Sequence, residues 1–342
     1  MPIRTDELVA VVGAGSWGSA LAHRVAIKGY RCLLWARRQE LADEIRETHK
    51  NPKYLRDYAL DASIETTSDL EEAAKARVLI IAVPSKGIRQ VAAKLGDYLQ
   101  PDQILLSATK GIEPKTYLRM TEVLKEETCC LKVGAISGPN LALEVMEGHP
   151  TATVVASPYD EVVEVGMKIL NHSNFRAYGS HDLIGVEMAG ALKNVMAISS
   201  GILTGIGYGA NTRGFLLSRG LAELMRLAEK MHADPITLSG LAGVGDLFVT
   251  CSSEQSRNFR VGMRIGSGES VRGILDSMHQ VAEGVRTVQA AYELAKQFNL
   301  SLPIIETIYQ IVYHEMSLSE ASAQLLGRPM KFELNPERIV HD

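Results

Sequence analysis

The sequence contains few cysteines and lacks the patterns by which metal sites are recognised. Its four cysteines are Cys32, Cys129, Cys130 and Cys251, and they form neither a C-x-x-C pair nor the spacing of a disulfide framework. The nine histidines are scattered without an H-E-x-x-H pattern or Cys/His pairing. We therefore expect reduced thiols, as in a cytoplasmic protein, and no metal site.

The chain also lacks any excess of positive charge. Lysine and arginine number 36 against 40 aspartates and glutamates, a formal net charge of −4. This balance gives no overall basic field that would attract nucleic acid or an acidic membrane, so any anion must be bound by a local site. No apolar signal segment precedes the first strand-like run, which favours a cytoplasmic location. The length of 342 residues is sufficient for two domains.

Long hydrophobic runs are scarce, and the one prominent run covers residues 183–209. Its charged side chains are Glu187 and Lys193. A helix that is apolar on nearly every face belongs in a core or a membrane, and the two internal charges favour a buried helix of a soluble protein with no membrane insertion. Lys193 either extends from the core toward the surface or serves a function. Gly190 lies one turn before it and leaves room for another backbone or a ligand.

A glycine motif lies near the start of the chain. Gly13, Gly15 and Gly18 have the G-x-G-x-x-G spacing, between a strand-like run at 8–12 and a helical segment at 19–28. In this context the glycines allow a tight turn, close approach of a pyrophosphate and helix packing on the strand. The helix N-terminus favours an anion. The motif therefore predicts a dinucleotide site.

Two arginines follow the second expected strand, residues 32–35. Arg37 and Arg38 stand about where an acidic residue would bind the ribose of NAD. Arginine can hold a 2′-phosphate and stack on adenine. We therefore expect NADP(H) to be preferred, with NAD(H) possible. The alternative is a basic surface patch at a helix start.

Strands and helices alternate over the first half of the chain, and helical patterns replace them near residue 181. We predict an α/β fold, with an N-terminal Rossmann-like, doubly wound and mostly parallel sheet in residues 1–181 and an all-helical domain in residues 182–342. Further strands are expected at residues 78–83, 103–107, 132–137, 151–156 and 175–178. Helices are expected at residues 183–209, 212–232, 285–298 and 303–313.

Two regions contain further candidate site residues. Lys110 and Gly138 lie in turns after strands, where ligands of such sheets bind, although either turn could be structural. Ser256 is expected to cap a helix that carries arginines, so its N-terminus offers groups that suit a phosphate. The alternative is a capped surface helix with a basic face. The candidates in this second region are Asp246, Ser256, Arg257 and Asn258.

Six blocks, read together, resemble the bacterial NAD(P)-dependent glycerol-3-phosphate dehydrogenases. In chain order they are G-A-G-S-W-G, A-T-K-G-I-E, S-G-P-N-L-A, G-A-L-K-N-V, G-D-L with Q-S-R-N, and A-E-G-V. The resemblance implies reduction of dihydroxyacetone phosphate to sn-glycerol 3-phosphate for phospholipid synthesis, and a homodimer. Two alternatives are a related 3-hydroxy acid dehydrogenase, which shares the architecture, and a non-catalytic NADP(H)-sensing protein.

The same resemblance implies roles for individual residues. Lys193 matches the family's proton-transferring lysine. Asn140 departs from the usual Ser or Thr, although an amide can still bond to a substrate oxygen. Cofactor-binding residues would be Gly13, Gly15, Ser16, Trp17, Gly18, Arg37, Arg38, Lys110, Ala142, Arg257, Val281 and Glu283. Substrate-binding residues would be Lys110, Gly138, Asn140, Lys193, Asp246, Ser256, Arg257 and Asn258.

Overall fold

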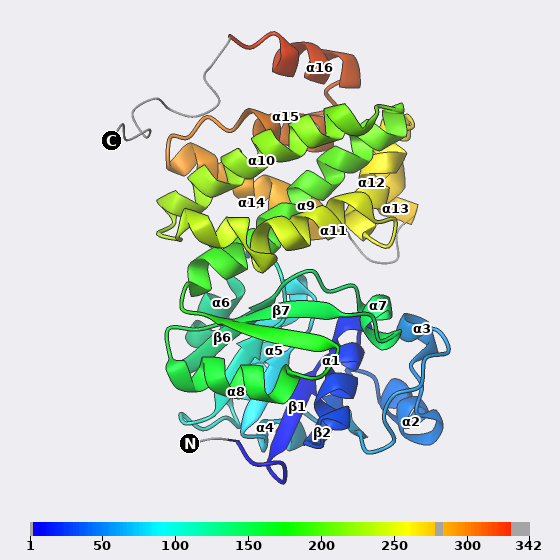
Figure 1. Cartoon of the computed structure of the whole chain (residues 1–342), viewed down its shortest axis with the longest axis vertical. Coiled ribbons are helices and arrows are strands. Elements are labelled where there is room, and N and C mark those ends of the chain that lie inside the picture. Colours follow the sequence, from blue (N-terminus) through cyan, green and yellow to red (C-terminus); the bar gives the residue numbers. More distant parts are fainter. Residues whose placement is uncertain (1–2, 278–282, 330–342) are drawn as a thin grey trace.

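The computed structural model describes residues 3–277 and 283–329. An eight-stranded sheet with its covering helices forms one half, and a group of helices forms the other (Figure 1). The strand order is β3-β2-β1-β4-β5-β6-β7-β8. Among the described strands only the β6–β7 pair is antiparallel, which confirms the mostly parallel sheet. The strands are β1 Leu8–Val12, β2 Arg31–Trp35, β3 Glu65–Thr67, β4 Val78–Ile81, β5 Ile104–Ser107, β6 Lys132–Ser137, β7 Thr151–Ala156 and β8 Phe175–Ser180.

Helices cover both faces of this sheet. Along β1 alternate side chains enter different cores: Val9 and Val11 belong to one cluster, and Ala10 and Val12 to the other. A strand buried on both faces reads as a continuous apolar run. These elements are α1 Ser16–Ile27, α2 Gln39–Thr48, α3 Pro52–Leu55, α4 Leu70–Ala74, η1 Ser85–Gly87, α5 Ile88–Gly96, α6 Met120–Glu127, α7 Ala142–Met146 and α8 Asp160–Leu170.

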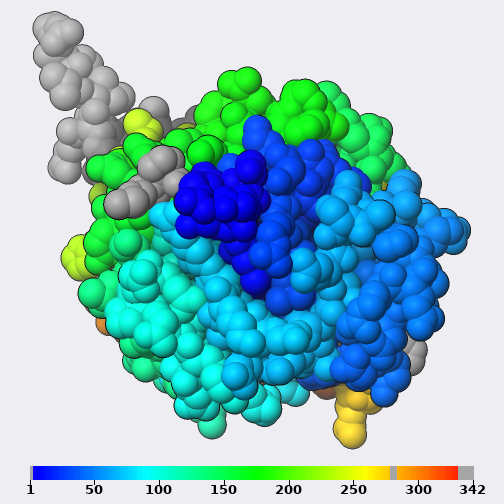
Figure 2. Space-filling model, turned by 90° about the horizontal axis from the view of Figure 1, so that it is seen from below, coloured from blue at the N-terminus to red at the C-terminus, as the bar shows by residue number. Residues whose placement is uncertain are grey.

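Several predicted boundaries in this half were wrong by one to three residues: β2 begins one residue earlier than predicted, β5 begins one residue later, and β8 ends at Ser180 rather than at residue 178. The first helix begins at Ser16 rather than at residue 19, because the extended backbone of the turn ends at Gly15 and the next residue is helical. β4 ends at Ile81 rather than residue 83, and Pro84 then precedes a short 3-10 turn. Seen from below, the surface of this end is made mainly by the sheet half, coloured blue to green (Figure 2).

The other half contains helices and no strands among its described residues. These elements are α9 Leu183–Ile206, α10 Ala210–Lys230, η2 Pro235–Ser239, η3 Leu241–Gly245, α11 Asp246–Ser252, α12 Arg257–Gly266, α13 Val271–Ser277, α14 Glu283–Gln297, α15 Pro303–His314 and α16 Leu318–Leu326. The change from strands to helices falls between Ser180 and Leu183. The division into two domains at residue 181 stays a prediction.

α9 is the central helix of this half (Figure 1). Asp182 caps its start by accepting a hydrogen bond from the Gly185 N–H, and Gly207 ends it in the left-handed conformation. Within the described residues α9 alone is long and apolar enough to cross a bilayer, but 78% of its most apolar window is buried inside the protein. The expected buried core helix is confirmed, but it ends at Ile206 rather than at residue 209, because Gly207 leaves the helical conformation.

Glycines allow α9 and α12 to pack backbone against backbone. A Cβ atom at Gly262 would lie 2.1 Å from the carbonyl oxygen of Ile198, and one at Gly201 would lie 2.1 Å from that of Phe259. Real Cβ atoms do not approach a carbonyl so closely, so neither position accepts a side chain without movement of a helix. The predicted phosphate-binding corner consists of Ser256, Arg257 and Asn258 at the start of α12. The contact between the two helices therefore fixes this corner relative to α9.

We predict that Gly262→Ala lowers the free energy of unfolding by about 2–3 kcal/mol, because the added methyl group forces the two helices apart. Urea unfolding followed by circular dichroism measures the effect. Gly214→Ala is the matched control, since that α10 position has open space around it and alanine favours a helix by about 1 kcal/mol over glycine. Equal stability of the two variants would contradict the proposed close packing.

Candidate functional site

The glycine turn after β1 has the geometry of a dinucleotide site. Gly13 has φ of 125°, and a Cβ there would lie 2.6 Å from the Ala82 carbonyl oxygen. A Cβ at Gly18 would lie 1.8 Å from the Gly13 carbonyl oxygen, so helix and turn touch. Gly15 has open space instead, and no side chain caps α1. The turn therefore fits a pyrophosphate, which would approach at Gly15 and bind the free N–H groups.

Side chains from α1 and from the segment after α2 hold this turn. Ser16 Oγ donates to the Tyr54 carbonyl oxygen at 3.0 Å. Asn51 is buried, and its Nδ2 donates to the Ala14 carbonyl oxygen at 3.1 Å and to Ser19 Oγ at 2.8 Å. Sequence reasoning missed Asn51, because its position before a proline indicates only a turn.

The other residues expected around the cofactor follow the carboxyl ends of strands, as the glycine turn does. Trp17 is half-buried against the core beneath α1. Arg37 and Arg38 are exposed just beyond the end of β2. Ala142 is the first residue of α7 and packs on the same core as Trp17. Their exposure and position leave them available to a nucleotide bound over the glycine turn.

Lys193 does not extend to the surface. The residue is only 7% exposed, and its Nζ donates to Asp246 Oδ1 and to Thr250 Oγ1, the latter at 2.6 Å. Asp246 is 1% exposed and also accepts from Lys110 Nζ, through Oδ2, at 2.6 Å. One buried carboxylate from α11 therefore lies between a lysine of the helical half and a lysine of the sheet half.

Burial lowers the pKa of Lys193 to about 8. Desolvation is the largest cause, Asp246 opposes it by favouring the ammonium, and the positive charge of Lys110 lowers the pKa further. An amine with this pKa can both release and accept a proton near neutral pH. With both lysines protonated the cluster has a net charge of +1, which suits an anionic substrate or a developing alkoxide.

Further contacts bring the remaining candidates to the same place. Asn258 Oδ1 accepts a hydrogen bond from the Gly284 N–H at 3.0 Å. A Cβ at Gly284 would lie 3.0 Å from the carbonyl oxygen of Asn194, the residue after Lys193. Glu283 Oε1 accepts from the Ser85 N–H, in the turn after β4, at 3.1 Å. These contacts bring together the predicted phosphate-binding corner, helix α9 with Lys193, and the carboxyl ends of the strands.

The turn after β6 uses its side chains mainly for its own structure. Gly138 has φ of 154°, and its carbonyl oxygen accepts from Lys110 Nζ at 3.1 Å. Asn140 Nδ2 donates to the Ala152 carbonyl oxygen at 2.8 Å, and its Oδ1 accepts from Thr153 Oγ1 at 3.0 Å. Both ends of the Asn140 amide are thus engaged, with one N–H still available to a ligand.

The start of α12 forms the expected cap. Ser256 is buried and its Oγ accepts from the Phe259 N–H at 3.3 Å, which leaves the hydroxyl proton for another oxygen. Arg257 is exposed at the first helical position, whereas Asn258 is buried. A surface helix with a basic face does not require a buried amide at this position, so the arrangement favours a binding site. Val281 lies outside the described residues.

Sequence reasoning missed Thr250 and one buried ion pair. Thr250 lies four residues after Asp246 on α11, and this helical spacing could have indicated it. Glu187 of α9 is buried and accepts from Arg119 at 2.5 Å, which connects the helical half to the loop before α6. Burial raises the pKa of Glu187, against the opposing charge of Arg119. No local sequence pattern indicates the ion pair between Arg119 and Glu187.

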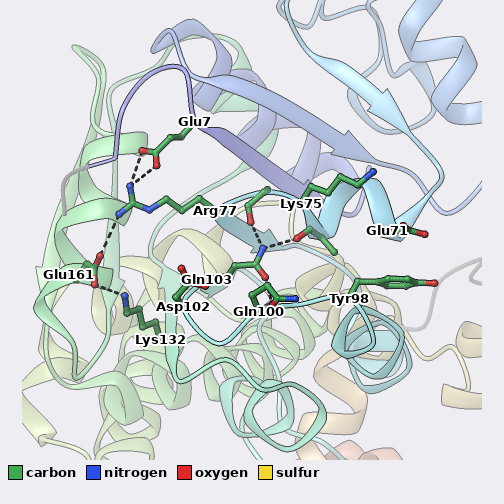
Figure 3. Close-up of a pocket in the computed structure, with 12 residues that line it drawn as sticks. Glu7, Glu71, Lys75, Arg77, Tyr98, Gln100, Asp102, Gln103, Lys132 and Glu161 are labelled. Atoms are coloured by element: carbon green, nitrogen blue, oxygen red, sulfur yellow. Dashed lines mark hydrogen bonds and ion pairs between the residues drawn. The ribbon is translucent and has the colours of Figure 1, made fainter.

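A surface groove of about 850 Å³ lies elsewhere. Apart from Glu161 on α8, its residues precede or begin β1, β4, β5 and β6, at the amino ends of these strands. Its charges largely neutralise one another: Arg77 contacts Glu7 at 2.8 Å and Glu161 at 3.4 Å, and Lys132 contacts Glu161 at 2.7 Å (Figure 3). Ligands of parallel sheets bind at the carboxyl ends instead. The described residues contain no cluster of three potential metal-binding side chains.

Comparison with known proteins identifies the family. The model of the NAD-dependent glycerol-3-phosphate dehydrogenase N-terminus matches residues 8–163, and that of the C-terminus matches residues 182–323. The chain belongs to the NAD(P)-dependent glycerol-3-phosphate dehydrogenase family.

Relatives of this glycerol-3-phosphate dehydrogenase family match nearly the whole chain. A glycerol-3-phosphate dehydrogenase [NAD(P)+] of Macrococcus caseolyticus is 42% identical over 94% of this chain and 98% of its own length. One of Moorella thermoacetica is 43% identical over 96% of this chain and 98% of its own length. The crystal structure of the Coxiella burnetii glycerol-3-phosphate dehydrogenase has a TM-score of 0.89 at 32% identity, covering 95% of this chain and all of that one.

We predict that Asp246→Asn destabilises this family member by about 3 kcal/mol at pH 7, because two buried ammonium groups lose their shared anion. The pKa of Lys193 should fall further, since Asp246 now raises it. The pKa of Lys193 in the folded chain already lies below its value in the unfolded chain. A larger difference lowers the free energy of unfolding at low pH, and this loss becomes smaller as pH rises.

Urea unfolding at pH 7 and at pH 9 measures this effect, with Asp57→Asn, an exposed position, as the control. The expected result is a loss at pH 7 that shrinks at pH 9 in the Asp246 variant alone. A loss of equal size at both pH values would contradict the electrostatic explanation.

Proposed function

We propose that Lys193 transfers the proton in the reaction of this family, the reversible reduction of dihydroxyacetone phosphate to sn-glycerol 3-phosphate by NAD(P)H. The chain is an NAD(P)-dependent glycerol-3-phosphate dehydrogenase by its family. The observation that supports Lys193 is its burial with Asp246 and Thr250, at the junction of the sheet and helical halves. Glycerol 3-phosphate supplies phospholipid synthesis.

The nicotinamide cofactor supplies the hydride when bound. Lys193 then stabilises the negative charge that develops on the carbonyl oxygen and donates a proton to it; in the reverse direction its free amine accepts that proton. Asp246 and Thr250 orient the amine. Lys110 shares Asp246, and its positive charge keeps the pKa of Lys193 low enough for proton transfer.

We assign substrate phosphate to the start of α12. Ser256 has a free hydroxyl proton, Arg257 supplies a guanidinium and Asn258 an amide beside uncapped backbone N–H groups. Binding the phosphate here holds the ketone for attack at the other end of the molecule. The substrate-binding set is Lys110, Gly138, Asn140, Lys193, Asp246, Ser256, Arg257 and Asn258.

The finer assignments also belong to this proposal. Arg37 and Arg38, exposed beyond β2, favour NADP(H) over NAD(H) because they can hold a 2′-phosphate. Glu283 and Arg257 would complete the cofactor site from the helical half. A homodimer in the cytoplasm is expected from the family and from reduced thiols.

We predict that Lys193→Met lowers turnover by about a thousandfold, because methionine has a similar shape and no proton to donate. NADPH affinity should stay nearly unchanged. Steady-state rates and fluorescence titration with NADPH measure the two effects. Lys94→Met, at an exposed position, is the matched control and should retain full activity. Substantial turnover by the Lys193 variant would exclude the lysine from the chemistry.

We predict that Arg257→Ala impairs the reduction of dihydroxyacetone phosphate far more than that of unphosphorylated dihydroxyacetone. A charge-assisted bond to phosphate is lost only with the first substrate. The ratio of kcat/KM for the two substrates, compared with the ratio in Arg260→Ala on the same helix, is the readout. Proportional losses with both substrates would indicate a structural role for Arg257.

We predict a higher kcat/KM with NADPH than with NADH. Arg38→Ala should lower the NADPH value more than the NADH value, since only NADPH carries the 2′-phosphate. Initial rates with each cofactor measure this, and an equal effect on both would separate these arginines from cofactor selection.

A further inference from the structure

A small internal cavity lies behind Lys110, between the sheet and α9. It offers about 10 Å³ to the centre of a water molecule, close to the minimum that one ordered water requires. Two strands, the turn after β5 and the buried helix enclose it. Its lining residues are Ser107, Thr109, Lys110, Gly111, Ala135, Ile136, Ser137 and Glu187.

Ser137 is the unusual member of this lining. It is the last residue of β6 and is only 3% exposed, yet its Oγ has no hydrogen-bond partner among the described residues. Buried hydroxyl groups are almost always paired, either with protein or with ordered water, because an unpaired one has lost its bonds to solvent. The orphaned hydroxyl and the cavity are two independent signs of the same ligand.

Other polar groups around the cavity can complete the coordination of a water. Ser107 Oγ makes only a long contact, 3.4 Å, with the Thr109 carbonyl oxygen. Glu187 Oε1 accepts one hydrogen bond, from the Thr121 N–H at 2.9 Å, and a carboxylate oxygen can accept a second. A buried water needs two to four such partners.

The position of Ser137 connects this cavity to the active site. A Cβ at Gly190 would lie 2.6 Å from Ser137 Oγ and 3.5 Å from Lys110 Cγ, so the hydroxyl and the lysine stem pack on the same spot of α9. Lys110 Nζ donates to the carbonyl oxygen of Gly138, the next residue after Ser137. A shift at the end of β6 therefore moves the acceptor that orients Lys110.

We propose that this cavity binds one ordered water molecule and that Ser137, bonded to it, is a positioning residue for Lys110. The water joins the end of β6 and the turn after β5 to the carboxylate of Glu187 on α9. The effect of this water on turnover rests on the proposed function, because Lys110 influences the reaction through Asp246. The presence of the water does not depend on that function.

Two variants test the proposal. Ser137→Ala removes the hydroxyl and adds no bulk against Gly190. Ser199→Ala is the matched control, because Ser199 is also buried on α9 and its Oγ donates to the Val195 carbonyl oxygen of the same helix. Ser199 does not line the cavity. Thermal unfolding first establishes that both variants are folded. High-resolution crystal structures of the full chain and of each variant locate the water.

The expected result is one water within hydrogen-bond distance of Ser137 Oγ in the unmodified chain and in Ser199→Ala, and its loss or displacement in Ser137→Ala. The Ser137 variant should also show about a tenfold lower kcat/KM for dihydroxyacetone phosphate, with unchanged NADPH affinity and a shifted midpoint in the pH profile of kcat, because Lys110 influences Lys193. A merely structural role would lower stability without moving that midpoint.

A dry cavity in the unmodified chain would overturn the proposal, and so would a Ser137→Ala variant with unchanged kcat/KM and pH profile. If the unmodified chain failed to reduce dihydroxyacetone phosphate, the proposed function would fail instead. The crystallographic comparison would then still decide whether Ser137 binds a water.

Discussion

The buried carboxylate of Asp246 between Lys193 and Lys110 is the interaction on which the site depends. Each lysine comes from a different half of the chain, so the carboxylate joins the sheet edge to the central helix. A lone ammonium at the depth of Lys193 would lose its proton, and a pair of ammonium groups would repel each other. One shared anion keeps both lysines in place and leaves the cluster attractive to a negatively charged substrate.

Glycines make this convergence of elements possible. Gly190 admits Ser137 and the stem of Lys110 against α9, and Gly262 admits the α9 backbone against α12. Gly284 lies between Asn258 and the carbonyl oxygen of Asn194. At each place a larger side chain would separate two elements that carry site residues. The active-site geometry is therefore set by backbone contacts as much as by the polar side chains themselves.

Short apolar runs in the sequence predicted the buried strands well, because burial of a strand depends on its own residues. The apolar runs of β6 and β7 gave the observed bounds, because strands buried in a sheet read as continuous hydrophobic segments. β3 was missed, since Glu65–Thr67 is short and polar at the sheet edge. Asn51 and the Arg119–Glu187 pair were also missed, because contacts between distant segments leave no spacing to read. The resemblance to a family, rather than periodicity, brought the scattered site residues together.

The pH dependence of kcat/KM in both directions tests the proton-transfer role of Lys193 most directly. Lys193 must carry its proton for ketone reduction and must lack it for alcohol oxidation, and its pKa is lowered to about 8. We predict that kcat/KM for reduction falls, and kcat/KM for oxidation rises, through a common midpoint near that value, because kcat/KM reports the free enzyme. Values of kcat/KM that stay flat in both directions from about pH 6 to about pH 10, with hydride transfer rate-limiting, would contradict this role.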